Sequence, residues 1–170
     1  PGVDLRIVDA ETGKTLPQGE IGIIEVKGPN VFAGYWQMPE KTKEEFRDDG
    51  FFITGDVGVI DAEGYVQIVG RSKDLIISGG YNIYPKELEL LLDEEDGVLE
   101  SAVIGVPHAD FGEGVVAVLV PKPGANLDEA TILDSIKPKI ARFKQPKRIV
   151  VLAELPRNTM GKVQKNVLRD

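Results

Sequence analysis

The sequence predicts an α+β fold in which a small antiparallel β-unit precedes a compact α+β domain with a small sheet flanked by helices. Up to about Gly70, short apolar or alternating runs are separated by glycine and proline turns, as is typical of strands. After Gly70, valine-rich runs alternate with segments whose apolar residues recur at helical spacing. We therefore expect two domains, residues 1–72 and residues 73–170.

The β-unit is expected to contain one helix and no long ones. Its predicted strands are Leu5–Val8, Ile21–Val26, Phe51–Thr54, Val57–Ile60 and Tyr65–Ile68, the last two joined by the turn Asp61–Gly64. The charged segment Pro39–Phe46 predicts a short helix. Because a parallel sheet needs helices over both faces, this pattern favours antiparallel strands.

The second domain is expected to mix helices and strands. Pro85 to Asp93 reads as a helix, with proline in its first turn and acidic residues near its positive end. The other predicted elements are strands Ser101–Val106, Val115–Val120 and Arg148–Leu152, a helix from the capping pattern Asn126–Glu129 to about Lys139, and a short helix Lys165–Arg169. Together they predict a small sheet with flanking helices.

Composition excludes several classes of function. The chain has 170 residues, a net charge of −8 and no cysteine. The acidic balance argues against general binding to nucleic acid or to anionic membranes, since both need clustered cations. Without cysteine there are no disulfides and no thiolate metal sites, and we expect no metal site within the chain. No apolar run approaches the roughly 20 residues of a membrane span, and no signal peptide is recognisable, so a cytoplasmic location is expected.

Three nucleotide-like or catalytic signals are rejected on context. Thr12–Thr15 resembles the end of a phosphate-binding loop, but it lies in a β-turn instead of preceding a helix. Gly112–Ala117 matches a loose dinucleotide fingerprint, yet a strand follows it. His108 is the single histidine and has no partners for a catalytic triad or a zinc site, so we expect a loop residue.

Four further signals each leave two interpretations open. Asp56, after a strand and a glycine, could accept hydrogen bonds from a ribose diol or could be a turn aspartate. Arg71 could donate to the same ribose or could belong to a solvated linker. The pair Gly79–Gly80 could admit another molecule close to the backbone or could form a plain turn. Lys162, behind a glycine in a loop that starts at a proline, could deliver a charge to a substrate or could be a solvated lysine.

The order and spacing of these signals are more specific than any one of them. The series is Glu20–Gly28, Gly34–Trp36, Phe52–Asp56, Gly70–Ile77, Ser78–Glu89, Phe143–Lys147 and Leu155–Lys162. It resembles the C-terminal third of the AMP-forming acyl-CoA synthetases, in the adenylate-forming superfamily, over essentially the whole chain. Within that family, the tail from Leu155 and the segment Val106–Glu113 look most like malonyl-CoA synthetases.

The resemblance implies a reaction in two steps. A carboxylate first attacks the α-phosphate of ATP, giving acyl-AMP and pyrophosphate, and the thiol of CoA then displaces AMP. A mobile C-terminal domain turns between the steps, while residues 1–72 would be the β-rich end of the large N-terminal domain. By this resemblance Asp56 binds the ribose hydroxyls of ATP or AMP, Arg71 supports it, and Lys73 is the hinge.

The resemblance also assigns roles in the second domain. Gly79 and Gly80 would line the path of CoA, and Lys162 would be the catalytic lysine of adenylation. A lysine between an anionic carboxylate and an anionic phosphate offsets their repulsion in the transition state. Lys162 is also in the setting that protein lysine acetyltransferases modify in this family, and a deacetylase would reverse that modification; acetylation would remove the charge.

Parts of the family's machinery lie outside this sequence. The phosphate loop, the acyl pocket and the residues that mainly hold Mg²⁺ belong to the N-terminal part, so we expect the chain alone to be inactive. Three alternatives remain open: a fatty or aromatic acyl-CoA ligase, a non-catalytic piece that serves as an acetyltransferase substrate, and an unrelated β-rich binding module.

Overall fold

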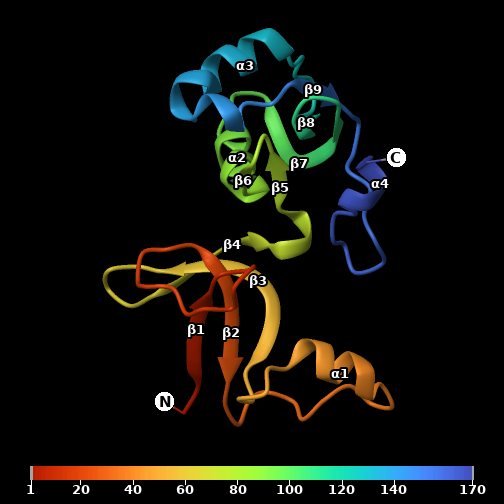
Figure 1. Cartoon of the computed structure of the whole chain (residues 1–170). Coiled ribbons are helices and arrows are strands. Elements are labelled where there is room, and N and C mark those ends of the chain that lie inside the picture. Colours follow the sequence, from red (N-terminus) through yellow and green to blue (C-terminus); the bar gives the residue numbers. More distant parts are fainter. Residues whose placement is uncertain (1, 170) are drawn as a thin grey trace. The chain divides into compact units, whose positions relative to one another are not determined.

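The computed structural model describes residues 2–169 of the chain, which forms two compact units. The first unit ends at Lys73 and the second begins at Asp74. Each contains its own sheet, and the elements run in the order drawn in Figure 1. The predicted α+β class, with a small antiparallel β-unit first, is confirmed.

The first unit is built on a four-stranded antiparallel sheet in the order β1-β2-β3-β4. Its elements are β1 (Asp4–Val8), β2 (Gly22–Lys27), helix α1 (Pro39–Glu45), β3 (Phe52–Ile60) and β4 (Val66–Arg71). The two separate strands expected at Phe51–Thr54 and Val57–Ile60 are one strand, β3. The pairing of β3 with β2 is irregular between Val57, opposite Ile23, and Ile53, opposite Glu25, so the strand continues through Gly55, where a break was expected.

A buried carboxylate organises the interior of this unit. Glu25 on β2 is fully buried. Arg6 on β1 and Arg47 pair with its two oxygens at 2.8 and 2.7 Å. Buried charges are rarely left without partners, and here two guanidinium groups supply them. Ile7, Val8, Ile24 and Val57 form the apolar part of the interior.

The second unit has a five-stranded mixed sheet. Its strands are β5 (Ile76–Ser78), β6 (Tyr81–Ile83), β7 (Val98–His108), β8 (Gly112–Pro121) and β9 (Arg148–Val151). The order is β6-β5-β8-β7, and β9 joins β8 in parallel while the other pairs are antiparallel. One side of β8 pairs with β7 throughout, and its other side is shared by β5 at Gly112 and β9 at Val116–Leu119.

Three α-helices belong to this unit: α2 (Pro85–Asp93), α3 (Glu129–Ile136) and α4 (Lys165–Arg169). The expected capping pattern begins at Asn126, but Asp128 is the residue that caps α3, accepting a hydrogen bond from the Thr131 amide. Regular α-helix ends at Ile136 instead of Lys139. Pro138, which has no N–H to donate, falls in a 3₁₀ turn over Lys137–Lys139.

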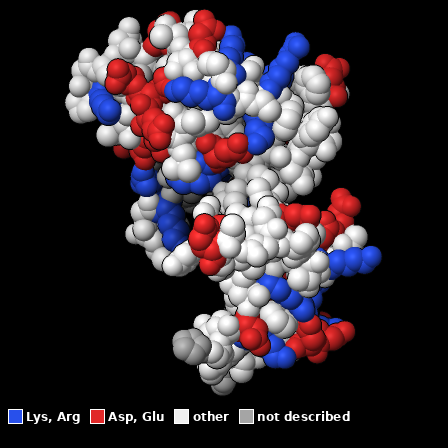
Figure 2. All heavy atoms as spheres, turned by 90° about the vertical axis from the view of Figure 1, so that its left-hand side faces the viewer, with Lys and Arg blue, Asp and Glu red and all other residues white. Residues whose placement is uncertain are grey.

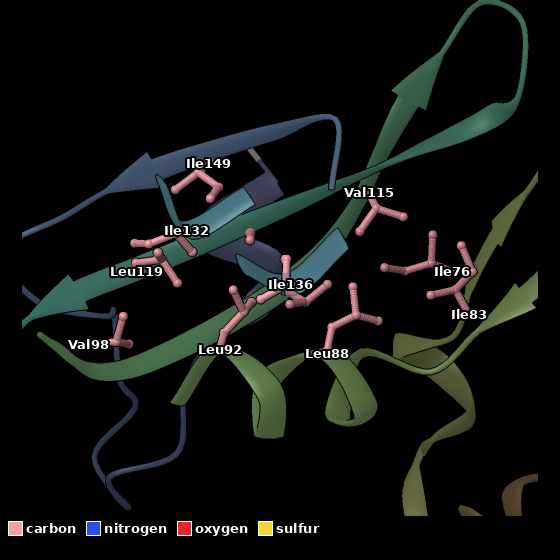
Figure 3. Close-up of a cluster of buried hydrophobic side chains, with 12 residues drawn as sticks. Ile76, Ile83, Leu88, Leu92, Val98, Val115, Leu119, Ile132, Ile136 and Ile149 are labelled. Carbon is pink, nitrogen blue, oxygen red and sulfur yellow. The ribbon is translucent and has the colours of Figure 1, made fainter. Parts of the chain in front are cut away.

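Both faces of the second sheet are covered. On one face α2 and α3 enclose a cluster that includes Leu88, Leu92, Val103 and Ile136, much of it drawn in Figure 3. On the other face the C-terminal segment packs Leu155, Val163 and Leu168 against alternate residues of β7 and β8. Because successive side chains of a strand point to opposite faces, Val103 serves the first cluster and Ala102 the second.

The structure bears on the expected position of His108, on the surface charges and on membrane-spanning helices. The expected loop position of His108 is wrong, because His108 is the last residue of β7 and pairs with Gly112 in the β7–β8 ladder. Acidic and basic side chains are interspersed on the face drawn in Figure 2. Within residues 2–169, no helix combines the length and the apolar character needed to cross a membrane.

Candidate active-site residues in the two units

Asp56 and Arg71 form an ion pair in the first unit. They are register partners on β3 and β4, with Arg71 Nε 2.8 Å from Asp56 Oδ1. The side chains keep 24% of the Asp56 surface and 53% of the Arg71 surface exposed, so a ligand can reach both. A partly exposed carboxylate with one oxygen held by a guanidinium can accept hydrogen bonds from a diol.

Local hydrogen bonds fix the backbone around this pair. The Thr54 hydroxyl donates to the Ile24 carbonyl at 2.8 Å and accepts from the Asp56 amide at 3.0 Å. Gly55 has a φ of 72°, a conformation that side chains other than glycine seldom adopt. The Ser72 hydroxyl donates to the Gly55 carbonyl at 3.1 Å. The Thr-Gly-Asp sequence therefore supplies both the turn and its fixation.

Lys73 lies at the end of the first unit. It is exposed within a 3₁₀ turn, Ser72–Asp74, and the division between the two units follows it directly. Its role as a hinge remains a prediction.

Gly79 and Gly80 turn the short β5–β6 hairpin. Their φ values are 57° and 82°. Two successive left-handed residues in a two-residue hairpin loop correspond to a type I′ turn, which glycine favours. The Gly79 amide donates to the Phe111 carbonyl at 2.9 Å, and both glycines are exposed. The backbone therefore forms a tight turn with an accessible main chain, and the role of the pair in the path of CoA remains a prediction.

Lys162 projects from a tight loop between β9 and α4. The Asn158 side-chain oxygen accepts from the amides of Met160 and Lys162, each at 3.0 Å. The Asn158 amide donates to the Lys162 carbonyl at 2.9 Å, and Gly161 has a φ of 78°. The Lys162 side chain is exposed, and its ammonium has no ion pair within the described chain. The loop thus holds the main chain of Lys162 and leaves its charge available.

Two residues that support this loop were not expected from the sequence. Arg157 donates to the Gly161 carbonyl at 2.8 Å and pairs with Glu100 on β7. Asn158 acts through its side chain on residues two and four positions later, a common Asx arrangement. An asparagine shortly before a glycine in a proline-started loop was the available signal for Asn158. No local sequence signal pointed to Glu100, because its partner Arg157 is distant in the sequence.

The predicted site residues thus fall into two sets. Asp56, Arg71 and Lys73 belong to the first unit, and Gly79, Gly80 and Lys162 to the second. Among residues 2–169, no cluster of three histidine or acidic side chains is arranged to hold a metal ion.

The chain matches two related protein families. Residues 87–162 match the AMP-binding enzyme C-terminal domain, and residues 1–36 match the AMP-binding enzyme family. The chain belongs to the AMP-binding enzymes and carries their C-terminal domain, which confirms the recognition made from the ordered motifs.

Individual relatives carry different names. A 3-[(3aS,4S,7aS)-7a-methyl-1,5-dioxo-octahydro-1H-inden-4-yl]propanoyl:CoA ligase from Rhodococcus jostii is 47% identical over 100% of this chain and 31% of its own length. An indoleacetate–CoA ligase from Aromatoleum aromaticum is 46% identical over 99% of this chain and 33% of its own length. The crystal structure of ATP-bound MatB from Rhodopseudomonas palustris has 66% sequence identity to this chain and a TM-score of 0.95. The match covers 99% of this chain and 34% of the MatB chain. The chain therefore spans about a third of the length of the relatives it matches.

Proposed function

We propose that this chain is the C-terminal part of an AMP-forming acyl-CoA synthetase that activates malonate. In the complete enzyme, meaning this chain with the N-terminal segment of its relatives, a malonate oxygen attacks the α-phosphate of ATP and pyrophosphate leaves. The sulfur of CoA, losing its proton, then attacks the acyl carbon and AMP leaves. Malonate is favoured because identity with MatB, a malonyl-CoA synthetase, is 66%, against 47% and 46% for ligases of larger ring-bearing acids.

The ion pair in the first unit supports nucleotide binding. We assign the ribose hydroxyls to Asp56, whose side chain stays 24% exposed while its Oδ1 pairs with Arg71. Arg71 orients the carboxylate as an acceptor through the charged contact at 2.8 Å. The hydrogen bonds around Thr54 and Gly55 hold this acceptor in place before ATP arrives, which reduces the ordering cost of binding.

Lys162 is proposed as the cation of the adenylation step. Its exposed ammonium, which forms no ion pair with residues 2–169, lies on a fixed loop and can be placed between two anions. Gly79 and Gly80 are proposed to line the path of CoA in the second step, with Lys73 absorbing the backbone rotation between steps. Mg²⁺ would accompany ATP and be held mainly by the N-terminal part.

A panel of acids separates malonate from the alternatives. The complete enzyme is incubated with ATP and one acid at a time, and pyrophosphate release is measured. Malonate should give the highest kcat/KM, above methylmalonate, acetate, an aromatic acid and a medium-chain fatty acid. A clear preference for a fatty or aromatic acid would replace malonate with that class while keeping the reaction type. Failure of all acids would count against the enzyme proposal itself.

Reversible acetylation of Lys162 is a second proposal. The observation that favours it is the exposure of the side chain on a loop whose hydrogen bonds use only the main chain of this residue. A modifying enzyme could therefore reach the amine without unfolding the loop. Incubation with a protein lysine acetyltransferase and acetyl-CoA should add one acetyl group at Lys162, which a deacetylase removes. An unmodified Lys162 under those conditions overturns this proposal.

A further inference from the structure

A carboxylate on α2 holds the start of α4. Glu89 is 8% exposed, and its Oε1 lies 2.6 Å from the Nζ of Lys165, the first residue of α4. The same oxygen accepts a hydrogen bond from the Val103 amide on β7 at 3.0 Å. One buried carboxylate thus connects α2, β7 and α4, although Glu89 and Lys165 are far apart in sequence.

The Lys162 loop lies between this ion pair and a buried leucine. Leu155, 4% exposed, enters the apolar cluster before the loop, and Val163 packs against the same cluster after it. Between them, the Gln164 amide donates to the Pro156 carbonyl at 2.8 Å, and Arg157 pairs with Val163 in a short antiparallel bridge. Lys165 follows this closure directly, so the ion pair lies where the loop passes into α4.

Helix α4 needs such an anchor. It has five residues, none of them buried. Isolated helices shorter than about 12 residues are marginal in water, so tertiary contacts must stabilise this one. The Lys165 side chain, 17% exposed, makes the shorter of two charged contacts, and Arg169 makes the other, 3.6 Å from Asp74. Leu168 makes the apolar contact.

We infer that Glu89 is a positioning residue which, through Lys165, sets where Lys162 is presented. This inference rests on the proposed role of Lys162 in adenylation. Glu89 does not contact Lys162 and takes no part in the chemistry. Its effect passes through α4 to the main chain of the loop. Because α2 also follows the Gly79–Gly80 hairpin closely, the same ion pair joins the two loops proposed to act in the two steps into one body.

Hydrogen exchange of this chain tests the anchoring without using activity. In Glu89→Gln the amide side chain can still accept from Val103 but carries no charge for Lys165. The amides of Met160, Lys162 and Gln164 should exchange at least about tenfold faster than in the unchanged chain, as expected for local opening. The matched control is Glu95→Gln, which removes another ion pair of the second unit, to Lys139 at 2.8 Å. Unchanged loop exchange in Glu89→Gln, or equal acceleration in the control, overturns the inference.

Kinetics of the complete enzyme test the consequence. Displacing a reacting group slightly lowers kcat more than binding, so Glu89→Gln and Lys165→Met should lower kcat of adenylation by about ten- to a hundredfold with little change in KM. Thioester formation from supplied acyl-AMP should change less than about twofold, because Lys162 acts only in the first step. Lys165→Arg, which keeps the charge, should retain most activity. Equal loss of both half-reactions would overturn the positioning role.

The two experiments separate this inference from the proposed function. If Lys162→Ala leaves adenylation intact, the proposed role of Lys162 fails, whatever the exchange data show. If Lys162→Ala abolishes adenylation while Glu89→Gln changes neither kcat nor exchange, only the anchoring by Glu89 fails.

Discussion

Arg71 Nε lies 2.8 Å from Asp56 Oδ1 across the β3–β4 ladder, so two motifs that are separate in the sequence form one acceptor site. From the sequence alone, Asp56 could also be a turn aspartate without a ligand, and Arg71 could be a solvated linker residue. Their pairing at a strand register, with exposed surface left on both, is compatible with the proposed ribose-binding role of Asp56.

Asp56→Asn should weaken ATP binding in the complete enzyme. The amide keeps the shape of the side chain but is a weaker hydrogen-bond acceptor, and it cannot form the ion pair with Arg71. The KM for ATP should rise about ten- to a hundredfold, since hydrogen bonds to charged groups contribute about 1.5–3 kcal/mol. Arg71→Lys should raise it less. Asp9→Asn, in an exposed turn of the same unit, is the control and should leave KM unchanged. An unaltered KM in Asp56→Asn would remove this residue from the nucleotide site.

Lys162→Ala should separate the two half-reactions. Loss of one well-placed charge lowers a transition-state-stabilised step by about 10²–10³-fold. Adenylation, followed as pyrophosphate release, should fall by that factor, while thioester formation from supplied malonyl-AMP stays near normal. Lys122→Ala, another exposed lysine of the second unit, controls for the loss of a surface charge. Equal loss of the two steps would contradict a role confined to adenylation.

Gly80→Asn should test the CoA path without breaking the turn. Asparagine tolerates the left-handed conformation, and a Cβ at Gly80 meets no atom within 4 Å. The fold should therefore persist while the KM for CoA rises and adenylation stays unchanged. Gly80→Val should instead destabilise the chain by about 1–2 kcal/mol in urea unfolding. Gly124→Asn, at a similar φ of 80°, is the control, and an equal effect on CoA there would refute the assignment.

Glu95 should make the stability of the second unit depend on pH. Burial raises the pKa of Glu95, but hydrogen bonds from Lys139 and Ser135 outweigh it and hold that pKa below the ordinary value of 4.5. The folded state therefore favours the ionised form. Ionised Glu95 therefore stabilises the folded state at pH values above its ordinary pKa. This stabilisation is lost as the pH falls through the lower pKa of Glu95 in the folded state.

Urea unfolding can measure this contribution. The unchanged chain should be more stable than Glu95→Gln at neutral pH, and the gap should close between about pH 5 and pH 3. A gap that stays constant over this range would show that the carboxylate of Glu95 does not titrate with folding.

The helices α2 and α4 could be predicted from the sequence, whereas the three-residue strands β5 and β6 could not. The bounds of α2 follow from proline at its start and leucines at helical spacing. By contrast β5 and β6 have three residues each, too few for an alternating pattern to emerge. Their pairing depends on the glycine turn and on β8, and only the former is visible locally.

The site shows the same division. Asp56, Lys162 and the glycine pair could be proposed from the sequence because each lies in a local motif. The roles of Glu89 and Glu100 could not, since their charges look like ordinary solvated helix or strand charges until distant segments bring Lys165 and Arg157 to them. The burial of Glu25 was missed for the same reason, as its two arginines come from separate parts of the first unit.

The hydrogen bonds from the loop main chain to the Asn158 side chain have a practical consequence for chemical biology. Because Asn158 bonds the amide of residue 162 and leaves the side chain free, that position can carry an artificial group. The chain has no cysteine, so Lys162→Cys would supply the sole thiol of this chain. Alkylation with bromoethylamine would rebuild an amine with sulfur in place of one methylene, and a fluorophore there would report the surroundings of the loop during turnover.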